Sequence, residues 1–426
     1  MLNETEPAGV TRPTLERRRF LQQLLVGGVA LGAASSVNAA LLKGRLFNSC
    51  NSPLPQHLAD HPIVTAAWSG IDPEKFWDCH AHIAGTGDSG SGIYISPDMQ
   101  SVWHPVQFAQ HAFYMNAACA HKGKVDQSYV EHMLHLVEEL KPGAKQMLFA
   151  FEQVHDQTGK ALPERTAFHV PNAYARDLAQ RYPNYFEWVC SIHPYRPDAV
   201  TALQAAVAEG ARAVKWLPSA MGIDPASDRC DDFYSALAQL DMPLICHAGE
   251  EKAVEGAGDH AAGNPLKLRR ALDAGVRVVI AHCATMGDDI DLDKGAHGPR
   301  VASFDLFGRM MAEARYQHLL FGDISAVTLR NRSADVLRAI IEHHDWHDRL
   351  LNGTDYPLPG VLPLTSPKKW AKAGLLDSTI VPVLNEIQNH NPLLFDFVLK
   401  RHLRAGEQQL PVNIFHTRDF FQRRAQ

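Results

Sequence analysis

Residues 76–83 read FWDCHAHI and place two histidines, His80 and His82, at the end of a short apolar run. Side chains two positions apart on a β-strand leave the same face, so both imidazoles point into one space. Two rings in one space either bind a common ligand or crowd each other. Which of the two applies depends on the residues that the fold brings beside them.

Seven further apolar runs follow this one along the chain. Together with 75–83, the expected strands are 145–154, 185–193, 211–217, 242–248, 276–283, 318–325 and 349–356. Most are apolar nearly throughout, which is typical of parallel strands covered on both faces. Between them lie helical patterns, several starting with Asp, Asn, Ser or Pro, at 129–140, 172–182, 197–209, 231–240, 264–274, 304–316 and 333–345.

Eight strands alternating with helices predict an α/β fold, a (β/α)₈ TIM barrel spanning residues 72–426. A doubly wound open sheet is the structural alternative. Residues 84–127 form a long insertion after strand 1, which we expect over the active-site mouth. The tail after Gly360 contains an apolar helical stretch, so we expect extra C-terminal helices outside the barrel.

The N-terminus has the pattern of an export signal. A charged segment, ERRRFLQ (16–22), precedes the apolar run LLVGGVALGAA (24–34) and the small-residue stretch SSVNA (35–39). Arg17-Arg18-Arg19-Phe20-Leu21 fits the twin-arginine form R-R-x-F-L. We therefore expect a signal peptide at 1–39, a linker at 40–71, the export machinery as a partner and a periplasmic or otherwise exported protein. An amphipathic N-terminal helix is the alternative.

Charge and hydropathy argue against two classes of partner. The net charge is -6, without an extended basic run, so nucleic acid or an anionic membrane surface is not expected. The apolar run at 24–34 is too short to span a bilayer, which takes about 20 residues, so no stable membrane insertion is expected. The sequence does not indicate an oligomeric state.

Seven cysteines are spread along the chain without a C-x-x-C pair, and they do not predict a disulfide framework. Three of them, Cys79, Cys246 and Cys283, directly neighbour histidines at predicted strand ends. Strand alternation predicts that these three face outward into the helix layer, where a free cysteine packs as a small apolar residue.

Chemically active side chains recur at the predicted strand ends, and in a TIM barrel these ends converge on one mouth. They are His80 and His82 on the first strand, Lys215 on the fourth, His247 on the fifth, His282 on the sixth and Asp355 on the eighth. A lone histidine or H-x-H predicts little. Several imidazoles with one carboxylate, however, suit Zn²⁺, and also Mn²⁺, Fe²⁺ or Co²⁺.

Four short motifs carry a family resemblance: DCHAH (78–82), ICHAGE (245–250), VIAHC (279–283) and NGTDYP (352–357). They resemble the amidohydrolase superfamily, in particular its amidohydrolase-related branch of TIM-barrel metal-dependent hydrolases, over roughly residues 72–420. The resemblance implies that His80, His82, His247 and Asp355 are metal ligands. It makes His282 a further ligand or an acid/base at the metal water.

The role of Lys215 stays open among three alternatives. In some amidohydrolase branches a lysine on this strand is carbamylated and bridges two metals, so either one or two ions are expected. Lys215 can equally contact substrate, or pair as a buried cation with Asp355. Candidate substrate contacts at other predicted rim positions are Glu152, His155, His193, Asp323 and Ser325, whereas Trp103, His104 and Trp216 are expected mainly to pack.

The resemblance implies a metal-dependent hydrolase of a small-molecule amide, ester, lactone or related bond. A metal-activated water would attack, with Asp355 as general base and His282 assisting. A non-oxidative decarboxylase or hydratase of the same superfamily is one alternative, and a non-catalytic exported metal- or ligand-binding barrel is another. No G-x-S-x-G, P-loop or H-E-x-x-H competes with this chemistry.

Overall fold

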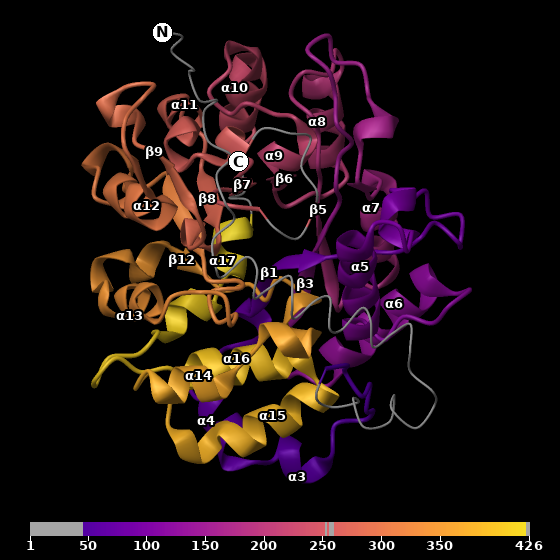
Figure 1. Ribbon diagram of the computed structural model, residues 1–426, viewed down its shortest axis with the longest axis vertical. Coiled ribbons are helices and arrows are strands. Elements are labelled where there is room, and N and C mark those ends of the chain that lie inside the picture. The colour runs from indigo at the N-terminus through magenta and orange to yellow at the C-terminus, as the bar shows by residue number, and fades with distance from the viewer. Residues whose placement is uncertain (1–45, 252–253, 255–259, 423–426) are drawn as a thin grey trace, which may run out of the picture.

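Eight parallel strands form the barrel, one from each predicted apolar run (Figure 1). The computed structural model describes residues 46–251, 254 and 260–422. The barrel strands are β1 (Trp77–His82), β3 (Lys145–Phe149), β5 (Phe186–Val189), β6 (Val214–Trp216), β7 (Leu244–His247), β8 (Val278–Ala281), β11 (Leu320–Asp323) and β12 (Leu350–Leu351). The predicted (β/α)₈ barrel is confirmed.

Two hydrogen-bonded sheets make up the barrel, one ordered β1-β3-β5 and the other β12-β11-β8-β7-β6. A parallel bridge between Cys190 and Val214 joins β5 to β6. On the opposite side, Cys79 N donates to Asn352 O at 3.0 Å, and Ala81 bridges Tyr356. The strands therefore close into a ring, and their carboxyl ends meet at one mouth.

The predicted helices lie outside the strands, with bounds within a few residues of those expected. They are α6 (Val125–Glu138), α7 (Asn172–Arg181), α8 (Ala199–Ala208), α10 (Asp231–Gln239), α11 (Arg269–Asp273), α12 (Ser303–Met311) and α13 (Ala334–Glu342). Of these seven helices, only α13 has a side-chain cap, in which Ser333 accepts from Asp335 N. Its buried Leu337, Ile340 and Ile341 lie on one face, which packs onto the barrel.

An inner core fills the barrel below the mouth. All eight strands or their immediate neighbours contribute to it, with the residues Trp77, Cys79, Met147, Phe149, Val189, Ala213, Ile245, Val279, Phe321 and Leu351. The short helix α17 (Arg418–Phe421) adds Phe420 and Phe421 and so covers the amino ends of the strands. The barrel interior is therefore filled with side chains, as in other barrels of this type, and the mouth lies above this packed core.

A β-bulge in β1 corrects one sequence prediction. The register with β3 shifts between Asp78 and Ala81, so that Cys79 and His80 together stand opposite Met147. Cys79 consequently packs in the inner core, and the prediction that it faces the helices is wrong because alternation breaks at the bulge. Cys246, on β7, and Cys283, two residues after β8, pack in the outer core, on the side that the sequence predicted.

The insertion after β1 is folded. It contains β2 (Tyr94–Ile95), which pairs with β4 (Phe168–His169), and the long helix α5 (Pro105–Ala117). Its first loop wraps around the buried carboxylate of Asp126, which accepts from Thr86 N at 2.7 Å and Ser91 Oγ at 2.7 Å. Three further short elements lie in the loops that follow β6 and β8. They are α9 (Pro218–Met221), β9 (Asp288–Ile290) and β10 (Arg300–Ala302).

Residues 46–71, expected as part of a linker, are also folded onto the domain. They include α3 (Gln56–Ala59) and α4 (Pro62–Ala67). A disulfide joins Cys50 to Cys119, just after α5, although the sequence did not predict one. The other five cysteines are free and buried. The predicted signal peptide at 1–39 lies outside the described residues.

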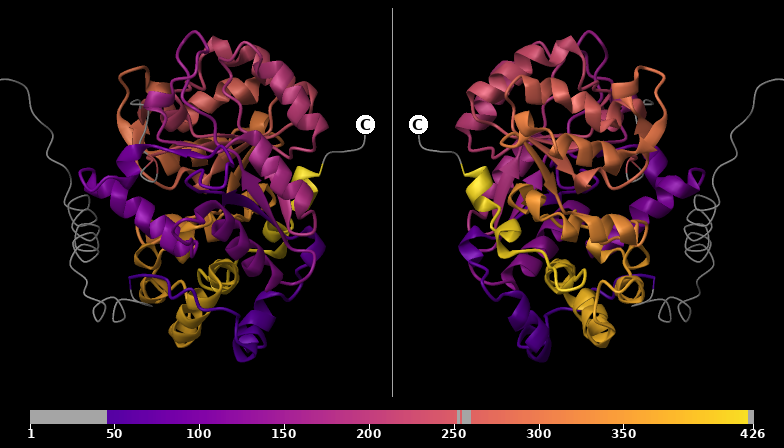
Figure 2. Two further views of the ribbon diagram at one scale, coloured as in Figure 1. Left: turned by 90° about the vertical axis from the view of Figure 1, so that its right-hand side faces the viewer. Right: turned by 90° about the vertical axis from the view of Figure 1, so that its left-hand side faces the viewer.

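Three C-terminal helices lie outside the barrel, as predicted, and gather with α4 at one end of the molecule (Figures 1 and 2). They are α14 (Pro367–Lys372), α15 (Val381–His390) and α16 (Pro392–His402). Arg401 of α16 donates to Ala67 O at 2.9 Å and so ties α4 to this group. Among the described residues, no helix combines the length and apolarity needed to cross a membrane.

Candidate active site

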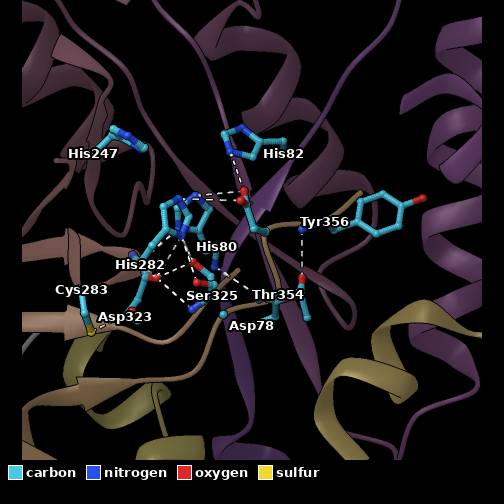
Figure 3. A network of polar contacts seen from close by, with 12 residues as sticks. Asp78, His80, His82, His247, His282, Cys283, Asp323, Ser325, Thr354 and Tyr356 are labelled. Carbon is cyan, nitrogen blue, oxygen red and sulfur yellow. Dashed lines mark hydrogen bonds and ion pairs between the residues drawn. The ribbon is translucent and has the colours of Figure 1, made fainter. Parts of the chain in front are cut away.

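The imidazoles predicted at the strand ends converge at the mouth (Figure 3), and the carboxylate of Asp355 lies beside three of them. Asp355 Oδ1 lies 3.2 Å from His82 Nε2 and 3.4 Å from His80 Nε2. Its other oxygen, Oδ2, lies 3.7 Å from His282 Nε2. One ligand atom from each of His80, His82 and Asp355 falls within 4.8 Å of the others, a spacing that could hold a metal ion.

Local backbone geometry brings these groups together. The bulge in β1 turns His80 into the barrel, while His82 follows on the same side. Asp355 N donates to His80 O at 2.8 Å, which aligns the residues after β12 with β1. Asp355 itself has a φ of 61°, in the left-handed region that ordinary residues avoid. A non-glycine residue in this conformation is typical of functional sites, where the surroundings hold it.

Asp323, at the end of β11, sets the protonation pattern of His80. Its Oδ2 lies 2.9 Å from His80 Nδ1, and both side chains are fully buried. The carboxylate can only accept, so Nδ1 carries the proton and the Nε2 lone pair of His80 faces Asp355. Asp323 Oδ1 also accepts from His282 N at 2.9 Å, so one carboxylate orients two candidate ligands.

His282 and His247 show the same arrangement. His282 Nδ1 lies 3.1 Å from the carbonyl oxygen of Ser325, an acceptor, which leaves Nε2 unprotonated toward Asp355. His247 Nδ1 lies 3.4 Å from Glu251 Oε2. Its Nε2 is buried and has no hydrogen-bond partner among the described residues. Metal-binding histidines typically hold one ring nitrogen with an acceptor and offer the other to the ion.

The electrostatics favour neutral imidazoles beside an ionised carboxylate. Burial lowers the pKa of His80 to about 4 and also lowers the pKa of His247 and of His282. Burial alone would raise the pKa of Asp355, but the surrounding imidazoles of His282, His80 and His82 outweigh it and hold that pKa well below its usual range. Neutral histidines and an ionised aspartate are the forms that bind metal. The residues present therefore fit a divalent ion.

Lys215 lies at the floor of this cluster and is almost fully buried. Its Nζ is 3.2 Å from His80 Nε2 and 5.0 Å from the centroid of the Phe149 ring. Burial lowers the pKa of Lys215, which favours the uncharged amine. The position is compatible with contact to a metal, a carbamate or a substrate, and all three alternatives stay open.

A cavity of about 100 Å³ extends from this cluster to the insertion. Its polar end consists of His80, His82, Lys215, His247, Glu251, His282 and Asp355. Its apolar wall includes Ile95, Met99, Tyr114, Met115, Phe151, Phe168, Leu217 and Leu358. The insertion thus lines the cavity, while no pattern in the sequence indicated which of its residues do so.

The other candidate residues divide into three groups. Asp323 and Ser325 join the imidazole cluster, as described above. Three others find partners away from the cavity: Glu152 pairs with Arg196, His155 and His193 pack ring to ring, and His193 Nε2 donates to Met221 O at 3.1 Å. Of the aromatic candidates, Trp216 packs in the outer core as predicted and His104 lies against Asp98, whereas Trp103 is 87% exposed, so the prediction that Trp103 packs is wrong.

A match to a family model over most of the chain shows which family this protein belongs to. A family model described as amidohydrolase matches residues 77–379. The chain belongs to the amidohydrolase family. That range spans all eight barrel strands of this amidohydrolase and every residue of the imidazole and carboxylate cluster. Among curated proteins, no match is found.

Several solved structures are similar to this amidohydrolase at low identity. The probable 2-pyrone-4,6-dicarboxylic acid hydrolase of Acinetobacter baumannii is 14% identical, with a TM-score of 0.42, over 76% of this chain and 99% of that chain. The 4-oxalomesaconate hydratase of Rhodopseudomonas palustris is 13% identical, with a TM-score of 0.40, over 81% and 95%. The 2,6-dihydroxybenzoate decarboxylase from Rhizobium is 13% identical, with a TM-score of 0.39, over 75% and 98%. These likenesses do not select a reaction.

Proposed function

We propose that this amidohydrolase is a metal-dependent hydrolase of an amide, ester, lactone or related bond in a small molecule. The observation that supports the proposal is the joint orientation of His80, His247 and His282. Each holds its Nδ1 against an acceptor and leaves Nε2 unprotonated, next to or near the ionised carboxylate of Asp355. Asp355 is thus placed both to bind an ion and to take a proton from a water molecule bound to it, and a binding role alone needs only the first of these.

His80, His82, His247 and Asp355 would hold the ion, with His282 as a further ligand or a proton-transfer partner. When bound, a divalent metal lowers the pKa of a coordinated water from 15.7 toward about 7. Zn²⁺ is the expected metal because the donors are mainly imidazoles, which also suit Mn²⁺, Fe²⁺ or Co²⁺.

Asp355 would act as the general base and acid. Its carboxylate accepts the proton of the attacking water at one oxygen and returns it to the leaving group. The unprotonated Nε2 of His282 lies 3.7 Å from Asp355 Oδ2 and can share that proton; once protonated, it can steady the developing negative charge. Lys215 is the further candidate for contact with that charge, because its side-chain amine lies at the floor of the cluster and can donate a hydrogen bond.

The cavity indicates the kind of molecule that fits. Its polar end lies at the imidazoles, while the opposite wall consists of aliphatic and aromatic side chains from the barrel loops and the insertion. A small molecule with one hydrolysable group and an apolar remainder matches this division.

The test is turnover of a broad ester, lactone and amide panel by metal-free protein before and after addition of Zn²⁺. The proposal expects activity only with the metal and products that carry the elements of water. Release of CO₂ from a carboxylated substrate, or addition of water across a double bond, would instead identify a decarboxylase or hydratase. Stoichiometric zinc without turnover of any substrate would favour the non-catalytic barrel.

We also infer that the protein is exported through the twin-arginine machinery. The motif at residues 17–21 supports this inference, and so does the disulfide between Cys50 and Cys119, since structural disulfides are rare in the cytosol. Replacing Arg17 and Arg18 by Lys should retain the protein in the cytoplasm of a host that possesses this machinery. Unchanged export of the variant would contradict the inference.

A further inference from the structure

The geometry points to Lys400, on the outer helix α16, as a positioning residue for Asp355. The inference rests on the role proposed above for Asp355 and extends the site to the C-terminal helices. Lys400 Nζ donates to Gly353 O at 2.6 Å, two residues before Asp355. It makes no contact with the cavity, so its effect on the reaction must pass through the backbone.

Gly353 lies where the chain after β12 presses against β1. A Cβ atom on Gly353 would stand 2.6 Å from His80 Cβ, closer than such atoms approach one another. The absence of a side chain therefore sets how closely Asp355 can approach His80. The carbonyl oxygen of Gly353 takes no part in the β1 pairing, in which Cys79 N donates to Asn352 O and Asp355 N to His80 O. Lys400 satisfies that oxygen from the outside.

Thr354 is held from the opposite side. Asp78 Oδ1 accepts from Thr354 N at 2.8 Å, and Asp78 Oδ2 accepts from Thr354 Oγ1 at 2.5 Å. Asp78 also accepts from His80 N at 3.1 Å, so it links the two sides of the site. Asp355 thus follows two residues that are fixed by β1 and by α16, which stabilises its left-handed conformation.

The placement of the charge supports a positioning role over simple packing. Lys400 is fully buried and pairs with Asp396 one turn earlier on the helix, at 2.5 Å. A buried ion pair contributes little net stability, and apolar residues of similar volume often replace such a pair without loss. Ten of the eleven residues of α16 are buried, so the helix has ample apolar contact for docking. What the ammonium adds is its bond to Gly353 O.

The test separates the hydrogen bond from the ion pair. Lys400→Met leaves Asp396 buried and unpaired, so this variant loses stability whatever its role in the site. In the double variant Asp396→Leu/Lys400→Met, both charges are replaced by apolar groups, which should recover most of the stability that Lys400→Met loses. The bond to Gly353 O is still missing in that double variant. The metal affinity and turnover of the double variant therefore measure how far this bond positions Asp355.

We expect the double variant to bind Co²⁺ about 10- to 100-fold more weakly than wild type, the usual cost of losing a residue that orients a metal ligand. The absorption spectrum of the bound Co²⁺ should change, and kcat should fall with KM little altered. Arg401→Met is the matched control, because Arg401 lies on the same helix and donates to Ala67 O and Leu410 O. It should lower stability without changing Co²⁺ affinity.

Wild-type Co²⁺ affinity, spectrum and turnover in the double variant would overturn the inference, as would an equal loss of affinity in Arg401→Met. Asp355→Asn keeps these outcomes distinct from the proposed function. If Asp355→Asn abolishes turnover while the double variant is normal, only the positioning role of Lys400 fails. If Asp355→Asn turns over normally, the proposed function itself fails.

Discussion

The carboxylate of Asp323 and the imidazole of His80 lie 2.9 Å apart, Oδ2 to Nδ1, with both side chains fully buried. Asp323 belongs to β11 and His80 to β1, so the contact crosses the barrel mouth. It fixes which nitrogen of His80 is free, and the same carboxylate holds His282 through its backbone N–H. The metal-binding form of the cluster is therefore prepared by the protein itself.

Replacing Asp323 by Asn should weaken metal binding by about 10- to 100-fold with the fold retained. The amide oxygen can still accept from His282 N, but its NH₂ group then faces His80 Nδ1. Two donors cannot share one bond, so His80 is driven to the tautomer with its proton on Nε2. Competition between the protein and a chelator for Co²⁺ measures the loss. Asp305→Asn, at an exposed position of α12, is the control, and equal affinities in both variants would refute this account of His80.

Asp355→Asn should leave a folded, largely metallated protein, because the imidazoles remain. Turnover should fall by orders of magnitude, since the amide cannot accept the proton of the attacking water. The measurement is kcat together with zinc content, on the best substrate of the panel. Turnover near the wild-type level in a zinc-loaded variant would remove Asp355 from the mechanism.

Removing the disulfide should lower stability and loosen the wall of the cavity. The disulfide links residues 69 positions apart in the sequence. Removing it in Cys50→Ser/Cys119→Ser increases the conformational entropy of the unfolded chain, which should lower the free energy of unfolding by about 4 kcal/mol. Because Cys119 follows α5, whose Tyr114 and Met115 line the cavity, KM should rise more than kcat falls. Denaturant unfolding and steady-state kinetics check both effects.

Reduction provides the control for that variant. A thiol reductant should shift the wild-type protein toward the behaviour of the double variant and leave the double variant itself unchanged. If the stability and KM of the wild-type protein do not change when the disulfide is fully reduced, the disulfide has no structural role.

Acid should destabilise the protein partly through His193, which lies outside the metal cluster. Its Nε2 donates to Met221 O and its Nδ1 accepts from Tyr195 N, so only the neutral ring fits. Burial lowers the pKa of His193 to about 3. Between its ordinary pKa of about 6.5 and that value, the unfolded chain binds a proton that the folded protein does not, so stability falls as pH falls.

His193→Gln removes this proton while keeping an amide that can donate and accept. The slope of unfolding free energy against pH, measured in urea between pH 6 and 4, should then be shallower by up to about 1.4 kcal/mol per pH unit. The comparison is made on metal-free protein so that metal release does not contribute. Identical slopes for wild type and His193→Gln would show that His193 has the same pKa in the folded and the unfolded protein.

Much of the fold could be predicted because its signals are local. Each of the eight apolar runs became a barrel strand, and the helices between them formed where capping residues and periodicity indicated. The bulge in β1 could not be predicted, since alternation assumes an uninterrupted strand, and it reversed the direction of Cys79. The pairing of Cys50 with Cys119 depends on contacts between segments far apart in the sequence.

The site was predictable to the extent that it consists of strand ends. His80, His82, His247, His282 and Asp355 converge because a closed barrel brings such ends to one mouth. The cavity wall from α5 and the bond from Lys400 to Gly353 were not predictable. Both depend on how an insertion and an outer helix pack, for which the sequence has no periodic signal.

Zinc content after dialysis against metal-free buffer tests the central claim most directly, for wild type and for His80→Ala/His82→Ala. We predict one or two equivalents per wild-type chain and a loss of bound zinc in the variant. Two equivalents would favour a carbamylated Lys215 as a bridge, and one would not require it. A wild-type protein that retains no zinc, or a variant that retains it in full, would contradict a metal centre at the barrel mouth.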